Sequence, residues 1–262
     1  MNYIESKENS FFKNTKKLKE KKFRVKEGKF LLEGLRLVEE AIKAEAKIEN
    51  IIIDEKVKDK ISEEKYIKSF DEKKIVILST SLFAQITQTE TPQGVVAVVK
   101  NPESKLNLEG SFYVVCDKVQ DPGNLGTIIR TSHAAGVDGI ILTKGSADIY
   151  NDKTLRSTMG SIFYVPVFYD DEDFTTIKEL QAKGFSLVVT SLQESRNFFE
   201  EDLKGKTMVT VGNEGNGVSN EIMNLSNKRV KIPMPGGAES LNVAIATSII
   251  LFEKVRQNSI NK

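Results

Sequence analysis

The chain has 262 residues, of which 39% are hydrophobic and 29% charged, with a formal net charge of +1. This length allows two domains with buried cores, and this composition is typical of a globular protein. The single cysteine, Cys116, excludes an intrachain disulfide and a cysteine-clustered metal site. The single histidine, His133, excludes multi-histidine metal sites and most histidine-based triads, so we expect no metal.

No stretch approaches the ~20 apolar residues of a membrane span, and the N-terminus has no apolar signal region, so we expect a cytoplasmic protein.

The positive charge is concentrated at the N-terminus. Residues 1–29 hold ten Lys or Arg against four Glu, which is +6, so the remaining residues sum to about −5. A basic block of this kind suggests a polyanionic partner, although the whole-chain charge does not. The alternative is a solvated lysine-rich helix.

The first hundred residues predict a small α/β domain. Residues 1–27 are expected to form a basic arm and a helix. Short apolar runs then alternate with helical spacing, which is typical of a compact α/β unit. The expected strands are Phe30–Leu32, Ile51–Ile53, Ile75–Leu78 and Gly94–Val99, and the expected helices are Glu33–Ala46 and Ser81–Thr87. Residues 101–110 combine a proline with turn residues and mixed polarity, so we interpret them as a linker.

Residues 111–262 predict a second α/β domain with longer strands. Apolar, β-branched strands between helices indicate a parallel sheet that is covered on both faces. The expected strands are Phe112–Cys116, Gly139–Leu142, Val165–Phe168, Ser186–Thr190 and Met208–Val211, and the expected helices include Gly126–Ala135, Thr154–Met159 and Thr175–Lys183.

The segment Asp117–Gly136, DKVQDPGNLGTIIRTSHAAG, follows the first of these strands. Loops at the carboxyl ends of parallel strands are where α/β proteins bind ligands. Asn124 is our candidate for the N-cap of the helix that follows. Arg130 lies in an otherwise small or apolar part of that helix, so it is either held for a phosphate or carboxylate or is an ordinary surface arginine.

The segment Val209–Ile222, VTVGNEGNGVSNEI, is a strand followed by a glycine-rich loop. Glycine allows positive φ and the close approach of a ligand. The spacing is not that of the dinucleotide fingerprint, there is no phosphate-loop lysine, and Glu214 would repel a pyrophosphate. The loop therefore suits a neutral or cationic ligand.

The segment Lys231–Phe252, KIPMPGGAESLNVAIATSIILF, joins a Pro/Gly-rich turn to a helix that is apolar on nearly every side. Such a helix is buried or lies at a subunit contact. The turn either offers main-chain groups to a small molecule or is an ordinary strand–turn–helix connection. A lesser feature is Leu155–Ser161, where Arg156 and Ser157 could contact phosphate, the alternative being a plain helix end.

Together, the runs NLGTIIR, VGNEGNG and IPMP…SLNVA resemble the three motifs of the SpoU/TrmH-type RNA ribose 2'-O-methyltransferases of the SPOUT superfamily. The resemblance covers about residues 112–256. Residues 1–100 resemble the family's substrate-binding domain more diffusely, through the basic start and Phe30–Ala41. The resemblance implies a C-terminal trefoil knot, S-adenosylmethionine as cofactor, and a homodimer formed through the C-terminal helix.

The resemblance also implies roles for individual residues. The family assigns the central role to the arginine of the first motif, here Arg130. Because a guanidinium stays protonated, we expect it to grip a phosphate and stabilise the developing alkoxide rather than to act as a literal base. Asn124, Ser240 and Asn242 are the other expected catalytic residues. The expected cofactor contacts are Thr190, Ser191, Leu192, Gly212, Asn213, Glu214, Gly217, Ile232, Met234 and Leu241, and the expected RNA contacts are Lys13, Lys17, Arg24, Arg156 and Ser157.

The leading hypothesis is a 2'-O-methyltransferase that acts on structured RNA, with ribosomal RNA favoured because minimal transfer-RNA members of the family often lack an N-terminal domain. Transfer RNA is the alternative substrate. Two other classes remain: a non-catalytic RNA-binding or ribosome-assembly protein on the same fold, and a nucleotide-dependent α/β enzyme. The intact motif residues argue against the former, and the glycine spacing argues against the latter.

Overall fold

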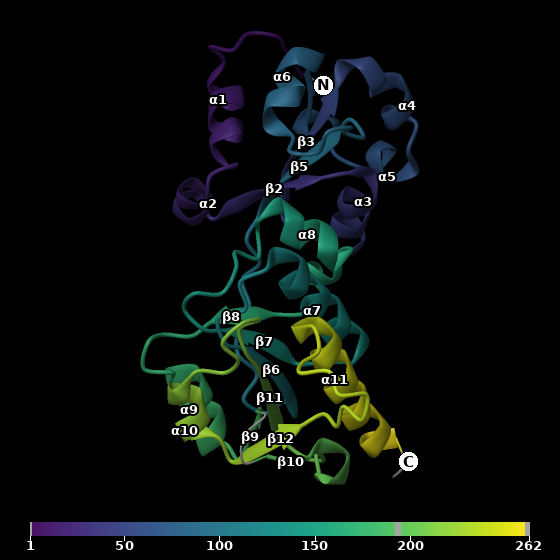
Figure 1. Ribbon diagram of the computed structural model, residues 1–262. Helices are drawn as coiled ribbons and strands as arrows, with labels where there is room; N and C mark the ends of the chain where they lie inside the picture. The colour runs from purple at the N-terminus through teal and green to yellow at the C-terminus, as the bar shows by residue number, and fades with distance from the viewer. Residues whose placement is uncertain (1, 192–194, 260–262) are drawn as a thin grey trace. The chain divides into compact units, whose positions relative to one another are not determined.

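The computed structural model describes residues 2–191 and 195–259, and these divide into two compact units (Figure 1). Unit 1 comprises residues 2–103 and 150–163, and unit 2 comprises residues 104–149 and 164–259. The segment 150–163 therefore belongs with the N-terminal part of the chain, although it follows the first strands of the second sheet in sequence. Within the described ranges, no helix has the length and apolar character needed to cross a membrane.

Unit 1 is built on a five-stranded mixed sheet. Its strand order is β1 (Asn2–Ile4), β4 (Ile75–Leu78), β3 (Ile48–Asp54), β5 (Val95–Lys100) and β2 (Lys29–Glu33). The first three are parallel, and β5 runs antiparallel to both of its neighbours. The apolar runs expected as strands all fall in this sheet. Strand β1 was not predicted, because three residues in which only Ile4 is buried carry no strand periodicity.

Helices surround this sheet. Helix α1 begins where the Asn9 side chain accepts hydrogen bonds from two backbone N–H groups, and α2 ends at Gly28 in the left-handed conformation. The Phe30 ring of β2 stacks on the Tyr150 ring, with 4.4 Å between the ring centres, and this contact joins segment 150–163 to the sheet. The helices of unit 1 are α1 (Ser10–Lys17), α2 (Lys21–Glu27), α3 (Leu35–Lys43), α4 (Lys58–Ser62), α5 (Lys65–Lys68), α6 (Thr80–Ile86) and α8 (Asp152–Thr158), with 3₁₀ turns at Glu55–Val57, Glu72–Lys74 and Ser161–Phe163.

Unit 2 is built on a seven-stranded sheet in which every pair is parallel, as the sequence predicts. The strand order is β10 (Arg196–Asn197), β12 (Lys228–Lys231), β9 (Ser186–Thr190), β11 (Thr207–Val211), β6 (Phe112–Cys116), β7 (Gly139–Leu142) and β8 (Val167–Tyr169). The bounds of β12 were not predicted, because three of its four residues are basic and only Val230 is buried. The chain thus places β11 between β9 and β6, while the trefoil knot itself stays a prediction.

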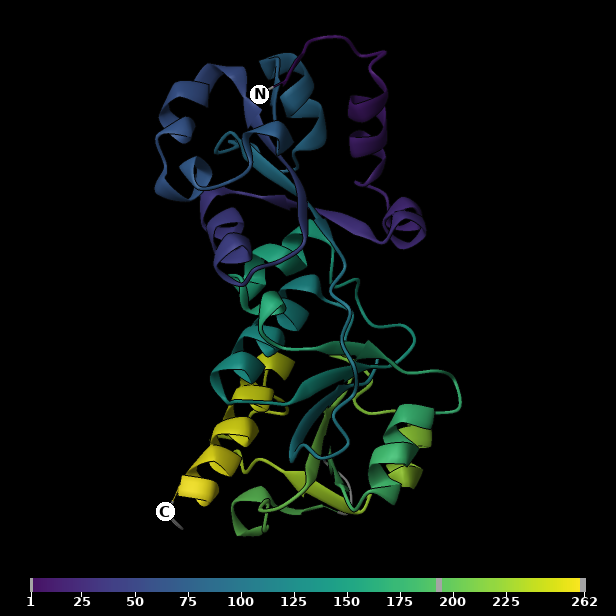
Figure 2. The ribbon, with the colours of Figure 1, turned by 180° about the vertical axis from the view of Figure 1, so that it is seen from behind.

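Helices cover both faces of this sheet, with α7 and α11 on one side and α9 and α10 on the other (Figures 1 and 2). Ile177, Leu180 and Ile222 pack against sheet residues on the α9 and α10 side. The helices are α7 (Pro122–Ala134), α9 (Thr175–Ala182), α10 (Asn220–Leu225) and α11 (Val243–Ser259), with a 3₁₀ turn at Phe198–Glu200.

The start of α7 differs from the prediction. Asn124 is not the N-cap, because the helix begins at Pro122 and its cap is Asp121, whose Oδ1 accepts a hydrogen bond of 2.8 Å from the backbone N–H of Asn124. Proline is well suited to the first helical position, because its φ is preset and it has no N–H to satisfy. The earlier start leaves the Asn124 side chain available for other contacts.

Candidate active site

The three sequence motifs meet at one edge of the unit 2 sheet. Because all the strands are parallel, the residues that follow β6, β9, β11 and β12 lie at the same edge. These strands end at Cys116, Thr190, Val211 and Lys231. The second and third motifs begin at the ends of β11 and β12, and the first begins eight residues after β6 ends at Cys116, which is why segments far apart in sequence come together.

The Glu214 carboxylate is the centre of this assembly. It accepts hydrogen bonds from the backbone N–H groups of Gln120 (3.3 Å) and Asp121 (3.2 Å) and from Nδ2 of Asn124 (3.0 Å). Burial pulls the pKa of Glu214 upward, but the hydrogen bonds from Asn124 and the backbone outweigh it and hold the pKa below its ordinary value. Glu214 therefore ties the second motif to the first as an ionised carboxylate.

A second amide extends this network to the third motif. Because a carboxylate only accepts, Asn124 must turn its NH₂ group to Glu214 and its Oδ1 outward. That Oδ1 accepts a 2.9 Å hydrogen bond from Nδ2 of Asn242. Oδ1 of Asn242 in turn accepts from the backbone N–H groups of Ala244 and Ile245 at the start of α11. The chain Glu214–Asn124–Asn242 thus connects all three motifs by oriented hydrogen bonds.

The loop after β11 is a tight turn that depends on Gly212. Asn213 and Gly217 exchange two backbone hydrogen bonds of 2.9 Å, and Oδ1 of Asn213 accepts from the N–H groups of Gly215 and Asn216. A Cβ on Gly212 would lie 2.1 Å from the carbonyl carbon of Gly217, which no side chain can do. Glycine is therefore required at position 212 by close backbone approach, not by positive φ.

Arg130 is exposed on α7, two turns beyond the start of the helix. In the part of the chain that the structure describes, its guanidinium has neither an ion-pair partner nor a hydrogen-bond partner. Its neighbours Ile128 and Ile129 are buried, so the helix is held in place beneath it. Arg130 and Asn124 lie on the same helix, α7, and no hydrogen bond joins their side chains. The Arg130 guanidinium is therefore available to an anionic ligand.

Four more predicted cofactor residues, Thr190, Ser191, Ile232 and Met234, lie at or just after the ends of β9 and β12. Thr190 Oγ1 donates to the carbonyl of Thr210 (3.2 Å), and the backbone N–H of Ser191 donates to the carbonyl of Val230 (2.9 Å). Ile232 and Met234 are half-buried after β12. The structure shows no contact of Ser240 or Leu241, both exposed, with the Glu214–Asn124–Asn242 network. Leu192 lies outside the described residues.

Comparison with known proteins identifies this arrangement. The model of the SpoU rRNA Methylase family matches residues 111–252, which is more than half of the chain. The chain belongs to the SpoU rRNA methylase family. A second family model, that of the MRM3-like substrate binding domain, matches residues 9–97, and confirms the resemblance of the N-terminal domain.

Whole-length relatives carry both parts of this SpoU-family protein. The chain is 39% identical, over 96% of its length and 98% of the relative's, to the 23S rRNA (guanosine(2553)-2'-O)-methyltransferase RlmP of Bacillus subtilis. The crystal structure of an AdoMet-bound rRNA methyltransferase from Sinorhizobium meliloti matches 98% of each chain with a TM-score of 0.82 and 34% identity. A TrmH/SpoU tRNA-modifying enzyme of A. aeolicus matches only 57% of this chain, with a TM-score of 0.51 and 35% identity.

Two of the predicted RNA contacts lie exposed on α1. Lys13 forms an ion pair with Glu8, and both side chains are exposed. Lys17 is exposed, with its Nζ 5.7 Å from the centre of the Phe23 ring. Surface pairs of this kind contribute little to stability, so these lysines remain free to exchange their partners for phosphate.

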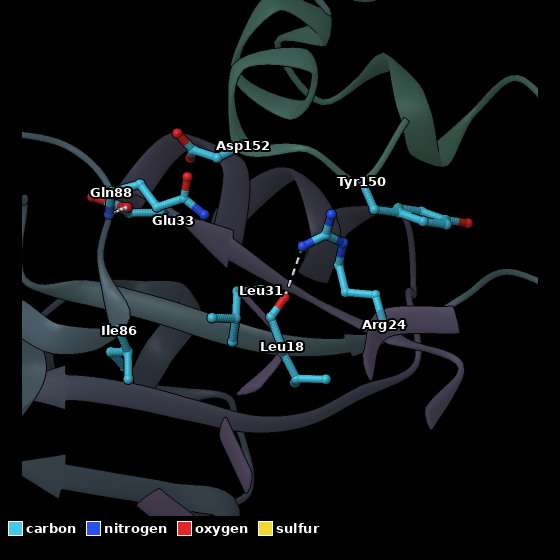
Figure 3. A pocket seen from close by; sticks show the side chains of 8 residues that line it. All are labelled: Leu18, Arg24, Leu31, Glu33, Ile86, Gln88, Tyr150 and Asp152. Carbon is cyan, nitrogen blue, oxygen red and sulfur yellow. Dashed lines mark hydrogen bonds between the residues drawn. The ribbon is translucent and has the colours of Figure 1, made fainter. Parts of the chain in front are cut away.

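Arg24 has a different role from the predicted one. It is only 6% exposed, and its Nη1 donates to the carbonyls of Leu18 (2.9 Å) and Lys19 (2.8 Å), which closes the end of α1. Figure 3 shows it beside a cavity of about 10 Å³ that also borders Tyr150 and Asp152. A cavity of this size holds about one water molecule and no larger ligand. The burial of Arg24 argues against direct contact with RNA.

The last two predicted RNA contacts lie on α8, in unit 1. Arg156 forms an ion pair with Asp152 one turn earlier, and Ser157 Oγ donates to the carbonyl of Lys153 (2.9 Å). The Arg156 side chain is 42% exposed, so it can still reach a ligand.

The buried carboxylate of Asp117 was not among the residues predicted for the site. This side chain is fully buried after β6, and it accepts from Oγ1 of Thr143 (2.9 Å) and from the backbone N–H of Ser219 (2.6 Å). An acidic residue directly after a run of buried strand residues was the available signal, since a charge there is costly unless it is satisfied.

Proposed function

We propose that this protein transfers the methyl group of S-adenosylmethionine to a ribose 2'-hydroxyl of ribosomal RNA. The observation that carries the proposal is the hydrogen-bonded chain Glu214–Asn124–Asn242, which joins the three family motifs in one site. Relatives that match nearly the whole chain are named as ribosomal RNA 2'-O-methyltransferases. The tRNA-modifying relative matches little more than half of it, which favours ribosomal RNA over transfer RNA.

The loops after β9, β11 and β12 fit S-adenosylmethionine. The absence of a side chain at Gly212, where a Cβ would strike backbone, brings the main chain of the Asn213–Gly217 turn close to the strand ends. Half-buried Ile232 and Met234 offer apolar surface beside main-chain groups. Bound S-adenosylmethionine supplies an electrophilic methyl group on a sulfonium, which is a good leaving group. The residues that would hold it are Thr190, Ser191, Gly212, Asn213, Glu214, Gly217, Ile232, Met234 and Leu241, with Leu192 outside the described residues.

The protein's own residues orient and activate the hydroxyl. Arg130 binds the phosphate next to the target ribose and stabilises the negative charge that develops on the 2'-oxygen, because its guanidinium stays charged and has no ion-pair or hydrogen-bond partner within residues 2–191 and 195–259. The Asn124 amide is oriented by Glu214 and the Asn242 amide by Asn124, and the two side chains position the ribose in line with the methyl group. Ser240 lies beside Asn242 in sequence and contributes its hydroxyl to the same region.

We also propose that the protein is a homodimer through α11. In the single chain this helix exposes 54% of Ile245 and 48% of Phe252, with half-buried Ile249 between them. The three recur at helical spacing and form one apolar stripe, and a stripe of this kind is stable when a second copy covers it. The cytoplasmic location expected from the sequence stays a prediction.

The test is Arg130→Ala. We expect methyl transfer to ribosomal RNA to fall by at least 100-fold, the scale of a lost transition-state contact, while calorimetry shows S-adenosylmethionine binding nearly unchanged. Arg196→Ala is the matched control, because this exposed arginine lies on the edge strand β10. The target nucleotide is found by mapping 2'-O-methylation across total RNA with and without the gene. Loss of cofactor binding in Arg130→Ala would contradict its role, and absence of cofactor binding in the wild type would favour a non-catalytic RNA-binding protein.

A further inference from the structure

Unit 2 contains a pocket of about 350 Å³ that shares Asn213 and Gly217 with the proposed cofactor site but is otherwise lined by residues with no proposed role. Three segments form it: the loop after β6, the turn after β11 and the start of α10. A volume of this size is in the range of small-molecule sites. Its principal side chains are Lys118, Gln120, Asn213, Asn216, Asn220 and Glu221.

The wall around Lys118 is held rigidly. Its backbone N–H donates to Oγ1 of Thr143 (3.0 Å), and its carbonyl accepts from Nδ2 of Asn213 (3.1 Å). Oγ1 of Thr143 in turn donates to the buried Asp117 carboxylate, which also accepts from the backbone N–H of Ser219. These contacts keep Lys118 at φ 55°, a left-handed conformation that costs of order 1 kcal/mol or more in a residue other than glycine. The backbone of this wall of the pocket is thus preorganised.

The side chains of the pocket are polar and complementary to one another. Lys118 supplies donors, Glu221 supplies acceptors, and the amides supply both. Lys118 and Glu221 are both exposed, and across the described chain no ion pair joins them, so each can reach a ligand in the pocket. A hydrogen bond from its own backbone N–H, and then the charge of Lys118, lower the pKa of Glu221, so it is an ionised acceptor at neutral pH.

This pocket adjoins the reacting site. The backbone N–H of Gln120, which lines the pocket, donates to Glu214 (3.3 Å), and Asn213 and Glu214 are consecutive. The pocket and the Glu214–Asn124–Asn242 network therefore share the Asn213–Gly217 turn. A nucleobase and its own 2'-hydroxyl are carried by one ribose, so a base site has to adjoin the ribose site.

We propose that this pocket binds the base of the nucleotide that is methylated, that this base is guanine, and that Glu221 and Lys118 select it. The inference rests on the proposed function. Among the four RNA bases only guanine places two N–H donors, N1–H and N2–H₂, side by side with a carbonyl acceptor next to them. One carboxylate accepts both N–H groups, and a lysine donates to O6. That edge is accessible only in an unpaired base, the form in which RNA is read by sequence-specific proteins.

The experiment is saturation-transfer NMR of the full-length protein with the 5'-monophosphates of guanosine, adenosine, cytidine and uridine, each titrated separately. We expect the wild type to bind GMP most tightly. Glu221→Gln places an NH₂ group against the N–H donors of guanine, so we expect its GMP affinity to fall at least 10-fold and the preference to disappear. Lys118→Asn, which tolerates the left-handed backbone, should weaken GMP as well. Glu179→Gln, an exposed glutamate on α9 outside the pocket, is the matched control.

Each outcome decides the proposal. Equal binding of the four nucleotides by the wild type, or an unchanged GMP preference in Glu221→Gln with a native melting temperature, overturns it. A large loss of S-adenosylmethionine affinity in Glu221→Gln also overturns it, because the pocket would then hold the amino-acid end of the cofactor. The nucleotide titration needs no RNA substrate. Failure to methylate ribosomal RNA alongside a Glu221-dependent GMP preference would therefore refute the substrate and leave the pocket standing.

Discussion

Replacing Gly212 by alanine tests whether the turn after β11 forms the cofactor site. The added Cβ would lie 2.1 Å from the carbonyl carbon of Gly217, 2.3 Å from its oxygen and 2.3 Å from the nitrogen of Val218. All three are backbone atoms, so the turn itself must move by more than about 1 Å to reach ordinary contact. That movement breaks the two Asn213–Gly217 hydrogen bonds.

The magnitude follows from these contacts. Overpacking costs about 1–3 kcal/mol, and each lost hydrogen bond costs about 1 kcal/mol, so the turn is destabilised by about 3–5 kcal/mol. If the cofactor requires the native turn, even the lower value corresponds to an affinity loss of about 100-fold. The strain lies in an exposed loop, so we expect the sheet to remain folded.

The assay is calorimetric titration of S-adenosylmethionine into Gly212→Ala and Gly215→Ala. A Cβ on Gly215 would lie 3.6 Å from Oδ1 of Asn213, which is an ordinary contact, so this variant is the matched control. We expect Gly215→Ala to bind the cofactor within about threefold of the wild type, because no backbone has to move. Wild-type affinity in Gly212→Ala, or equal losses in both variants with native melting curves, would refute the reasoning.

Two further predictions concern α11. Lys254 is 1% exposed and donates to the carbonyls of Leu203 and Gly205, and burial lowers its pKa from 10.5 to about 8. Because the unfolded chain holds this proton up to a higher pH than the folded chain, stability relative to Lys254→Met should rise between pH 8 and 10.5, by up to about 3 kcal/mol. Urea unfolding of the wild type and Lys254→Met at pH 7 and pH 10 measures this change in stability. Titratable groups that the two proteins share cancel in the difference between their free energies of unfolding. If that difference does not change with pH, the lowered pKa of Lys254 is excluded. Phe252→Glu places a charge in the exposed apolar stripe, so analytical ultracentrifugation should show a monomer. The control Asn258→Glu should sediment as a dimer, like the wild type. If Phe252→Glu is also a dimer, the interface does not lie on this stripe.

Local patterns predicted most of the elements. Strands β4, β6, β7 and β9 have the bounds expected from their apolar runs, because a buried parallel strand is apolar along its whole length. The bounds of β12 were not predicted, because a strand with three basic residues and one buried valine looks like a loop in sequence. The expected start of α7, Gly126, is four residues later than the observed one, because the helix is capped by Asp121 and has Pro122 as its first residue.

The sequence by itself determined the family, the order of the motifs and the residue types at the site, because these depend on what is adjacent along the chain. Only the tertiary structure decided which of them touch. Asn124 meets Glu214 across 90 residues and Asn242 across 118. The same holds for Arg24, whose charge suggested RNA but whose buried guanidinium closes a helix. Hydrogen bonds and burial of this kind arise from strand order and packing, which no local pattern encodes.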